Sequence, residues 1–345
     1  MKIVPPRLSR KVLPLLALVA CSTAPARDLE VDRAGTTAYK TLAAAAKEAQ
    51  PGDTIRVKPG SGPYREILRI PASGTGDNPI VFDGGNNVIT GFAPLTDWEE
   101  KDGVTSCHLP KSPRVLTYKG ERLVEDYATG KFLKYADLSE TRDRLILRPG
   151  VEKTDWEYSK RDFAVEVKNA SYQIYRNVRA SGSTNDGFNL HGVGTGLVFE
   201  NIEGFQNMDE GFSTHDSIQT TIRGGKFWGN DNGIANSYKT SDVVSSVIKD
   251  VDIYDNLGRG LVLHDCQATV ENVRCWNNGV TQIRFQNAKI ACEKVTAFTP
   301  SFTTRPWVSY HDTHSAEANS PMTVLDIVKT ALSGTAPVIE AAHHP

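Results

Sequence analysis

The chain has 345 residues, 39% of them hydrophobic, and a formal net charge of −2, which is the composition of a folded protein rather than a disordered one. Without its first 20 residues it carries 35 basic and 41 acidic groups. This balance argues against a nucleic-acid-binding protein, because such proteins present a basic surface. The length is large for one ordinary hydrophobic core but normal for a repeat fold.

The N-terminus has the pattern of a signal peptide over residues 1–20. A basic stretch over residues 2–11 precedes an apolar stretch over residues 12–20, which is too short to span a bilayer. Residues 18–21 (Leu-Val-Ala-Cys) resemble a bacterial lipobox, which implies lipidation of Cys21; cleavage after Ala26 is the alternative. Both predict export, either as an outer-membrane or periplasmic lipoprotein or as a secreted protein. A lipid on Cys21 is the only membrane attachment we expect.

The next segment predicts the start of a solenoid. Thr37 is the expected N-cap of a helix over residues 38–49, whose alanine run favours helix. Such a helix would cover the exposed first turn of a repeat fold. The segments 52–65 and 72–82 resemble the opening coils of secreted β-helix polysaccharide lyases, and this resemblance implies the same fold from about residue 27.

Residues 93–160 interrupt the later pattern. They contain several short strand-like segments, such as residues 115–118 and 145–148, with Gly120 at a turn. We predict a β-rich excursion from the main body, placed where it can form one wall of a groove.

From residue 172 onward, a glycine followed by a large apolar residue recurs. Gly187, Gly211, Gly233 and Gly260 are 24, 22 and 27 residues apart, and Gln282 takes the glycine's place in the last copy. A period this short, with alternating strands, excludes two-helix repeats and fits one turn of a parallel β-helix. The glycines fit a sharp bend into each strand.

A second series runs in phase with the first, an aromatic residue followed two places later by asparagine. Its members are Phe205, Trp228, Tyr254, Trp276 and Phe298, with Asn207, Asn230, Asn256, Asn278 and finally Pro300. Turns of a β-helix stack about 4.8 Å apart, so we expect the rings to stack and the asparagines to form hydrogen bonds along the column. The sequence therefore predicts an all-β, right-handed parallel β-helix over residues 27–300, acting as a monomer.

Residues 301–345 lose the repeat and predict a C-terminal tail or cap, with a short helix over residues 323–332. The four remaining cysteines do not occupy equivalent positions on adjacent turns, so we expect no disulfide among Cys107, Cys266, Cys275 and Cys292.

The repeated strand also predicts one outward face with chemical character. Side chains alternate along a strand, so the residues between the buried ones point outward. Three outward columns result, and they collect histidines, carboxylates and arginines. The first contains Asp186, Glu210, Asn232 and Arg259; the second Asn189, Ser213, Ala235, Val262 and Arg284; the third His191, His215, Ser237, His264 and Gln286.

Residues 210–216 (Glu-Gly-Phe-Ser-Thr-His-Asp) resemble a motif of mannuronan C5-epimerases, Tyr-Gly-Phe-Asp-Pro-His followed by an acidic residue. The similarity continues through residues 221–223 and 230–234 to residues 259–261. It implies that His215 handles the C5 proton and that Arg259 holds the substrate carboxylate. The family's tyrosine is Glu210 here and its aspartate is Ser213.

Such chemistry needs a base and a group that neutralises the developing enolate charge. We expect His215 as the base, with His191 one turn away, and assign catalytic roles also to Arg259 and Glu210. Asn189, His264, Arg284 and Lys239 are the expected substrate-binding residues, Lys239 being a second candidate base. Asp186 and Asp209, with Glu210, are expected to hold Ca²⁺.

The sequence therefore predicts an exported β-helix protein that acts on a uronate-containing polysaccharide as a lyase or epimerase. One alternative is a glycoside hydrolase that uses Asp186 with Asp209 and Glu210 as paired carboxylates. Another is a non-catalytic cell-surface β-helix that binds glycan or protein, and external aromatic side chains would favour it. A metal ion on His191, His215 and a carboxylate is a further alternative.

Overall fold

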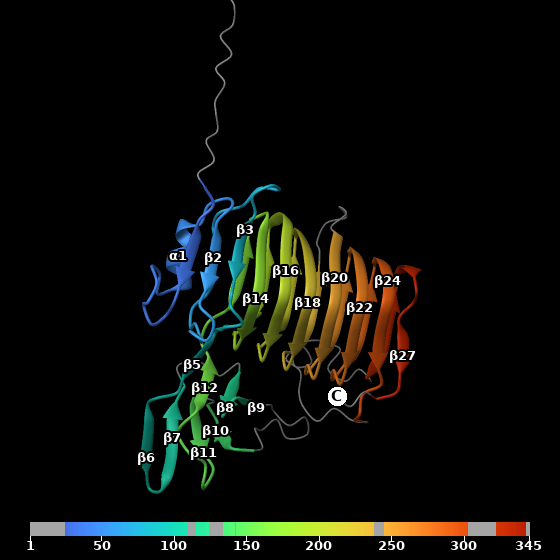
Figure 1. Ribbon diagram of the computed structural model, residues 1–345. Helices are drawn as coiled ribbons and strands as arrows, with labels where there is room; N and C mark the ends of the chain where they lie inside the picture. Colours follow the sequence, from blue (N-terminus) through green and yellow to red (C-terminus); the bar gives the residue numbers. More distant parts are fainter. Residues whose placement is uncertain are drawn as a thin grey trace, which may run out of the picture.

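The computed structural model describes residues 25–109, 115–123, 134–141, 143–237, 245–302 and 322–342. Within them the chain is a right-handed parallel β-helix, as predicted, with its turns stacked from the N-terminal to the C-terminal end (Figure 1). Among the helices described, none is both long and apolar enough to cross a membrane.

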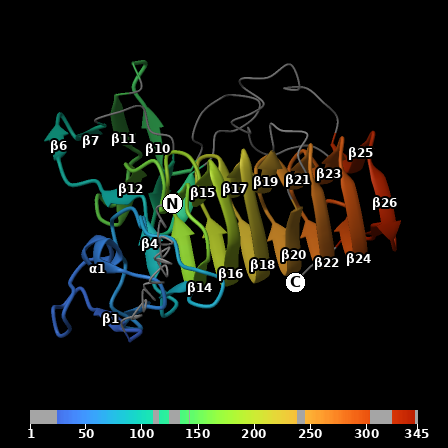
Figure 2. The same cartoon turned by 90° about the horizontal axis from the view of Figure 1, so that it is seen from above.

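Two parallel sheets form the walls of the solenoid, and Figure 2 shows their strands in two rows. The long sheet contains β1 (Asp28–Val31), β2 (Thr54–Val57), β3 (Ile80–Asp83), β4 (Val88–Thr90), β14 (Gln173–Ser181), β16 (Val193–Phe205), β18 (Ser217–Trp228), β20 (Ser245–Tyr254), β22 (Gln267–Trp276), β24 (Lys289–Phe298), β26 (Ala331–Gly334) and β27 (Val338–Glu340). The second sheet, called the site sheet below, contains β13 (Val165–Lys168), β15 (Phe188–His191), β17 (Glu210–His215), β19 (Asn232–Ser237), β21 (Arg259–His264), β23 (Thr281–Gln286) and β25 (Thr323–Val328).

A bend divides each long strand from β14 to β24 into two legs. A residue with positive φ sits at each bend, for example Asn201 in β16 (50°) and Asn272 in β22 (51°). The pairing of β16 with β18 omits this position and resumes after it. Glycine, asparagine and aspartate tolerate this backbone conformation and occupy the bends from β14 to β22, while Lys294 adopts it in β24. The bends therefore recur in register, and the cross-section has three sides.

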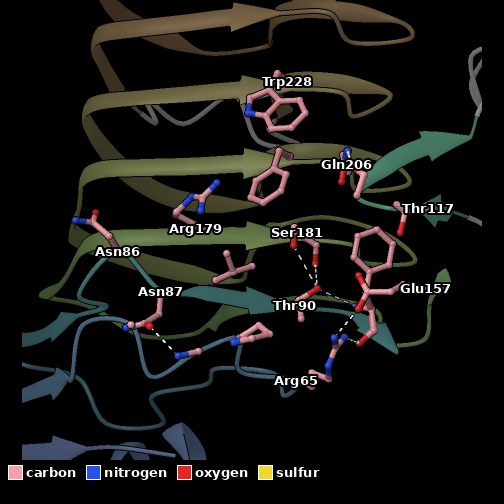
Figure 3. A pocket seen from close by; sticks show the side chains of 17 residues that line it. Arg65, Asn86, Asn87, Thr90, Thr117, Glu157, Arg179, Ser181, Gln206 and Trp228 are labelled. Carbon is pink, nitrogen blue, oxygen red and sulfur yellow. Dashed lines mark hydrogen bonds and ion pairs between the residues drawn. The ribbon is translucent and has the colours of Figure 1, made fainter. Parts of the chain in front are cut away.

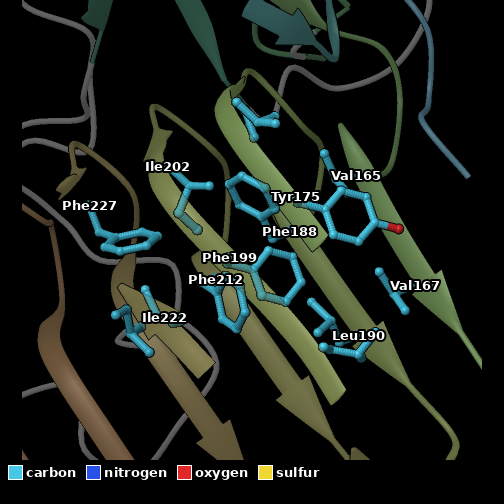
Figure 4. Packing of buried hydrophobic residues seen from close by; sticks show 14 of the residues in the cluster. Val165, Val167, Tyr175, Phe188, Leu190, Phe199, Ile202, Phe212, Ile222 and Phe227 are labelled. Atoms are coloured by element: carbon cyan, nitrogen blue, oxygen red, sulfur yellow. The ribbon is translucent and has the colours of Figure 1, made fainter. Parts of the chain in front are cut away.

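The interior between the sheets is filled by apolar side chains from both. Phe188 and Phe212 of the site sheet meet Tyr175 and Phe199 of the long sheet (Figure 4). The Tyr175 and Phe199 rings stack with centroids 5.1 Å apart, and Phe188 meets Phe199 edge to face at 5.9 Å. Each of these side chains is fully buried, so the inward half of the predicted alternation is confirmed.

The N-terminal helix is shorter than predicted. The α1 helix (Leu42–Glu48) starts after Thr41, whose hydroxyl accepts a hydrogen bond from the Ala44 amide, so Thr41 and not Thr37 is the N-cap. The preceding residues are held extended because Tyr39 forms a parallel bridge with Val31 of β1. The helix buries Leu42 and two alanines against the first turn, which is the capping role expected.

The excursion predicted near residues 93–160 consists of two small antiparallel sheets beside the N-terminal end of the solenoid (Figure 1). One contains β6 (Trp98–Lys101), β7 (Val104–His108), β10 (Ala136–Leu138) and β11 (Arg144–Leu147), and the other contains β5 (Phe92–Pro94), β8 (Leu116–Tyr118), β9 (Glu121–Leu123) and β12 (Trp156–Ser159). The excursion has its own core around Trp156, separate from the core of the solenoid.

The asparagine column forms the predicted ladder in full. From Asn230 onward, each side-chain oxygen accepts from the backbone and side-chain amides of the asparagine one turn earlier, for example Asn230 Oδ1 from Asn207 at 3.0 and 2.9 Å. Asn207 Oδ1 accepts from the Ser183 amide at 3.1 Å. The left-handed conformation belongs to the residue before each asparagine, as at Asp255 (φ 52°). All the ladder side chains are fully buried, which explains why the amides must pair with each other.

The glycine column is required for a different reason than the predicted bend. None of Gly187, Gly211, Gly233 and Gly260 has a positive φ. A Cβ on Gly260 would lie 2.7 Å from Asn278 Nδ2 and 2.4 Å from the Gln282 carbonyl oxygen. The glycines therefore make room for the asparagine ladder.

Gln282 ends this ladder. Its Oε1 accepts from the Asn278 backbone amide at 3.0 Å and from the Asn278 side chain at 2.9 Å. The next turn has Pro300 in place of an asparagine, so a long amide side chain from the glycine column supplies the missing acceptor. The irregular last repeat therefore marks the end of the asparagine ladder.

The aromatic column stacks as predicted. The ring pairs Phe205–Trp228 and Tyr254–Trp276 have centroids 4.9 and 4.6 Å apart and are nearly parallel, with interplanar angles of 14° and 4°. Trp276 and Phe298 meet edge to face instead.

The helix predicted for residues 323–332 is wrong. Residues 323–328 form strand β25, which pairs with β23, and β26 and β27 both pair with β24. The alternating sequence Thr-Val-Leu-Asp-Ile-Val adds to an open strand edge, and this long-range pairing outweighs local preference. The solenoid therefore continues past the end of the sequence repeat. The four described cysteines are free and buried.

Candidate functional site

The outer face of the site sheet presents the three predicted columns in register. The third column runs from Lys168 through His191 and His215 to Ser237, His264 and Gln286. The first runs through Glu210 and Asn232, and the Asn232 side-chain oxygen accepts from the Arg259 amide at 3.0 Å. The repeat thus brings together residues that lie far apart in the sequence.

Three carboxylates meet at the start of β17. Asp186, Asp209 and Glu210 each place one oxygen within 4.8 Å of the others. Asp186 is 2% exposed, while Asp209 and Glu210 are half-buried. We call these three residues the acidic cluster.

Neutral donors hold the acidic cluster in place. Asn189 Nδ2 donates to Asp186 at 2.6 Å, and the Glu210 amide donates to the other Asp186 oxygen at 3.2 Å. Asn232 Nδ2 donates to Glu210 at 3.1 Å. Asn189, predicted to bind substrate, is itself 2% exposed, and its amide is committed to Asp186.

Burial raises the pKa of Asp186 to about 6. The nearby charge of Asp209 acts in the same direction, while the hydrogen bonds from Glu210 and Asn189 oppose the shift. Asp186 therefore changes protonation state in a range where ordinary aspartates are fully ionised.

The acidic cluster fits a hard divalent cation. Ca²⁺ binds oxygen ligands at about 2.3–2.6 Å, so two oxygens on one ion lie at most about 5 Å apart. The separations in the cluster satisfy this limit, and all three donors are carboxylate oxygens. Among the residues that the structure describes, this is the one group of three acidic, histidine or cysteine ligands close enough to share an ion.

The two imidazoles of the third column stack face to face. The His191 and His215 ring centroids are 4.5 Å apart with an interplanar angle of 17°. His215 Nε2 lies 2.8 Å from the Ser213 hydroxyl, and His191 Nδ1 lies 3.4 Å from Asp216. Ser213 is fully buried, so it orients the His215 ring rather than meeting a ligand.

The acidic cluster and the histidine pair occupy opposite ends of β17. His215 is five residue steps from Glu210, or about 16 Å along an extended strand. The structure thus brings His191 to His215 and Asp186 to Glu210, but it does not join the two groups at one point. A ligand that touches both must extend over several sugar lengths.

The remaining predicted residues lie further along the stack. His264 is two strands beyond His215, and its Nδ1 lies 2.6 Å from Asp265. Arg284 pairs with Asp326 at 3.3 Å and donates to Gln286 at 2.8 Å. Lys239 and Cys21 fall outside the described residues.

Two residues that the sequence analysis did not select belong to this face. Lys168 is the last residue of β13 and precedes His191 in the third column. Because β13 lacks the repeated glycine, the repeat did not reveal Lys168. Arg122 of β9 donates to the Asn207 carbonyl at 2.8 Å and lies close to Asp231. Only the tertiary contact of the excursion with the solenoid places Arg122 there.

Comparison with known proteins supports the fold. No family profile and no curated protein matches the sequence. A solved glycoside hydrolase structure is 10% identical, with a TM-score of 0.54 over 92% of this chain and 96% of that one. At this identity the likeness concerns the fold alone, and it agrees with the right-handed parallel β-helix described above.

Two further solved structures align less closely. The pectate lyase Pel9A is 12% identical, with a TM-score of 0.42 over 92% of this chain and 79% of that chain. The mannuronan C-5 epimerase AlgE4 A-module from Azotobacter vinelandii is 11% identical, with a TM-score of 0.30 over 84% and 87%.

Proposed function

We propose that this protein is an exported carbohydrate-active enzyme that removes the C5 proton of a uronate residue, as a lyase or epimerase. The observation that carries the proposal is the stacked His191–His215 pair, which Ser213 and Asp216 hold on the outer face of the site sheet. An oriented imidazole is a suitable base near neutral pH.

The columns suit a polysaccharide that lies along the solenoid axis. A pyranose is about as long as the ~4.8 Å step between turns, so successive sugars can meet successive side chains of one column. Lys168, His191, His215 and His264 place cationic or proton-binding groups along that path. These groups attract uronate carboxylates and orient the reacting sugar over His215.

The acidic cluster gives the proposal its cofactor. Ca²⁺ held by Asp186, Asp209 and Glu210 would neutralise a uronate carboxylate that binds beside it. Because the cluster lies about 16 Å along the strand from His215, a chain that follows the histidine column does not pass over it, and the ion would hold a branch or a second chain instead. Asn189 and Asn232 keep the cluster's oxygens directed together.

A hydrolase is the second candidate, and the raised pKa of Asp186 favours it. A carboxyl group that is still about half protonated near pH 6 suits a general acid. The cluster's oxygens lie closer together than the ~6.5–9.5 Å between the carboxylates of inverting enzymes, so a retaining mechanism fits better.

A screen of uronate polymers tests the proposal. The enzyme is incubated with alginate, pectate and a neutral glucan, each with Ca²⁺ or with EDTA, and three products are followed. Absorbance from new unsaturated ends reports a lyase, reducing ends without absorbance report a hydrolase, and inverted C5 configuration by NMR reports an epimerase. We expect the first or third signal on a uronate polymer, and less of it in EDTA.

Two histidine variants locate the base. His215→Ala is expected to lower turnover at least about 10²-fold, because general-base catalysis contributes about 10²–10⁴-fold. His264→Ala, in the same column two strands away, removes a group on the substrate path but not the base, so it should raise KM while kcat stays near that of wild type. Equal activity of wild type and His215→Ala, or reducing ends as the only product, would contradict C5 proton removal by His215.

A further inference from the structure

A cavity of about 490 Å³ lies between the excursion and the long sheet, away from the columns of the site sheet. Phe205, Trp228 and Ser181 line it from the solenoid, and Thr117 and Glu157 line it from the excursion (Figure 3). A cavity of this size accommodates a small ligand such as a single sugar residue.

The cavity lies where the aromatic column stops. Strand pairing places Phe205 in register with Ser181, and Ser181 in register with Thr90, so small hydroxyl residues replace the ring in the two preceding turns. One side of Phe205 is covered by Trp228, with centroids 4.9 Å apart. On its other side the column lacks a ring, and Figure 3 shows Ser181 and Thr90 below Trp228.

One polar atom of the cavity wall has no partner. Thr117 is 1% exposed, and its hydroxyl forms no hydrogen bond within the described part of the chain. A buried hydroxyl without a partner is unfavourable, so it points to a ligand group that completes it.

The charged groups of the wall are already neutralised. Arg65 donates to Glu157 at 2.5 Å, and Arg179 donates to Glu203, which also accepts from the Trp228 indole at 2.7 Å. The Arg179 guanidinium also lies 5.1 Å from the Phe205 ring centroid, so it shares that face of the ring with the cavity. Paired charges favour a neutral ligand over an acidic one.

We propose that this cavity binds one neutral pyranose residue of a glycan, at a site separate from the proposed catalytic face. The apolar face of the sugar continues the aromatic column against Phe205, because C–H groups pack well on a ring face. One of its hydroxyls completes the hydrogen bonding of Thr117. The excursion thus completes a second carbohydrate site.

Binding can be measured without catalysis. The full-length protein is titrated with cellohexaose, xylohexaose, mannohexaose and galactohexaose, and with tetragalacturonate and adenosine as an acidic and a flat aromatic probe. Isothermal calorimetry gives the affinity, and quenching of tryptophan fluorescence reports contact near Trp228. We expect at least one neutral hexasaccharide to bind, and tetragalacturonate not to bind at this site.

Three variants define the site. Thr117→Val keeps the shape and removes the hydroxyl, so binding should weaken about fivefold, the equivalent of one hydrogen bond, with no loss of thermal stability. Ser181→Phe fills the cavity with a further ring of the column and should abolish binding. Tyr254→Ala alters the same column outside the cavity, and binding should be unchanged.

The outcomes separate this proposal from the proposed function. His215→Ala should bind the neutral probe as well as wild type does, so an inactive catalytic face leaves this result intact. Absence of binding by all four neutral hexasaccharides would overturn the proposal. So would binding of adenosine or tetragalacturonate alone, or equal affinity of wild type and Ser181→Phe.

Discussion

Asp186 illustrates how position changes the chemistry of one side chain. The repeat puts it in the same column as Glu210, but its burial comes from the side chains packed around it, including Asn189. Burial and the charge of Asp209 favour the protonated form. Ionising Asp186 in the folded protein without a cation therefore costs free energy. Groups with pKa values perturbed in this way are common at functional sites.

The pH dependence of stability should reveal this cost. The pKa of Asp186 is about 6 in the folded protein, above the ordinary value of 3.8 expected when unfolded. Below about pH 4 both states hold the proton, so there is no penalty. As pH rises from about 4 to 6 the unfolded state loses its proton first, and stability falls by on the order of 3 kcal/mol, then stays level.

Urea unfolding of wild type and Asp186→Asn in EDTA, at intervals between pH 4 and 7, measures this term. The difference between the two proteins cancels the titrating groups that do not interact with Asp186. We expect it to change by on the order of 3 kcal/mol in favour of the variant as pH rises. A difference that does not vary with pH would show that Asp186 titrates normally.

At the scale of the elements, the turn before the site sheet depends on two columns acting together. The asparagine ladder satisfies buried amides, and the glycine column leaves space for it. Gln282 shows the same rule at the end of the stack, where a side chain from the glycine position replaces a missing asparagine. We therefore expect a substitution in either column to destabilise this turn.

Gly260→Ala should be strongly destabilising. Its Cβ would meet a backbone oxygen at 2.4 Å and the Asn278 amide at 2.7 Å, and neither can move without breaking the ladder. Overpacking of this kind costs about 1–3 kcal/mol, measured as a loss of unfolding free energy in urea. Gly76→Ala is the control, because its Cβ would meet only Tyr172 Cε1, at 3.8 Å. Equal stability of the two variants would refute the packing argument.

At the scale of the whole molecule, the two proposed sites lie on different faces of the solenoid. The site sheet carries the acidic cluster and the histidine pair, and the excursion adds a cavity at the long sheet. A solenoid suits this arrangement because each turn contacts only its neighbours, so an insertion can leave the stack without disturbing it. Whether the proposed polysaccharide ligand reaches these faces depends on where the protein resides.

Export with a lipid on Cys21 remains our proposal for that location. Bacterial cells that express the full chain with labelled palmitate should yield a labelled protein, and Cys21→Ala should abolish the label. Cys107→Ala, which alters a buried thiol, should leave the label unchanged. A mature chain that begins at Arg27 without label would instead support cleavage after Ala26.

The sequence by itself determined the solenoid, because a repeat of about two dozen residues places the equivalent residues of successive turns one above another. It also predicted the stacked rings, the asparagine ladder and the columns that contain Glu210 and His215. Local signals failed at Thr37 and at residues 323–332, where pairing with strands distant in the sequence decided the structure.

Only the tertiary structure decided the depth of Asp186 and the cavity beside Phe205. Each depends on how side chains from different turns, or from the excursion, pack against one another. A repeat gives the height of a residue in the stack, but burial and cavity shape arise from contacts that no periodicity encodes.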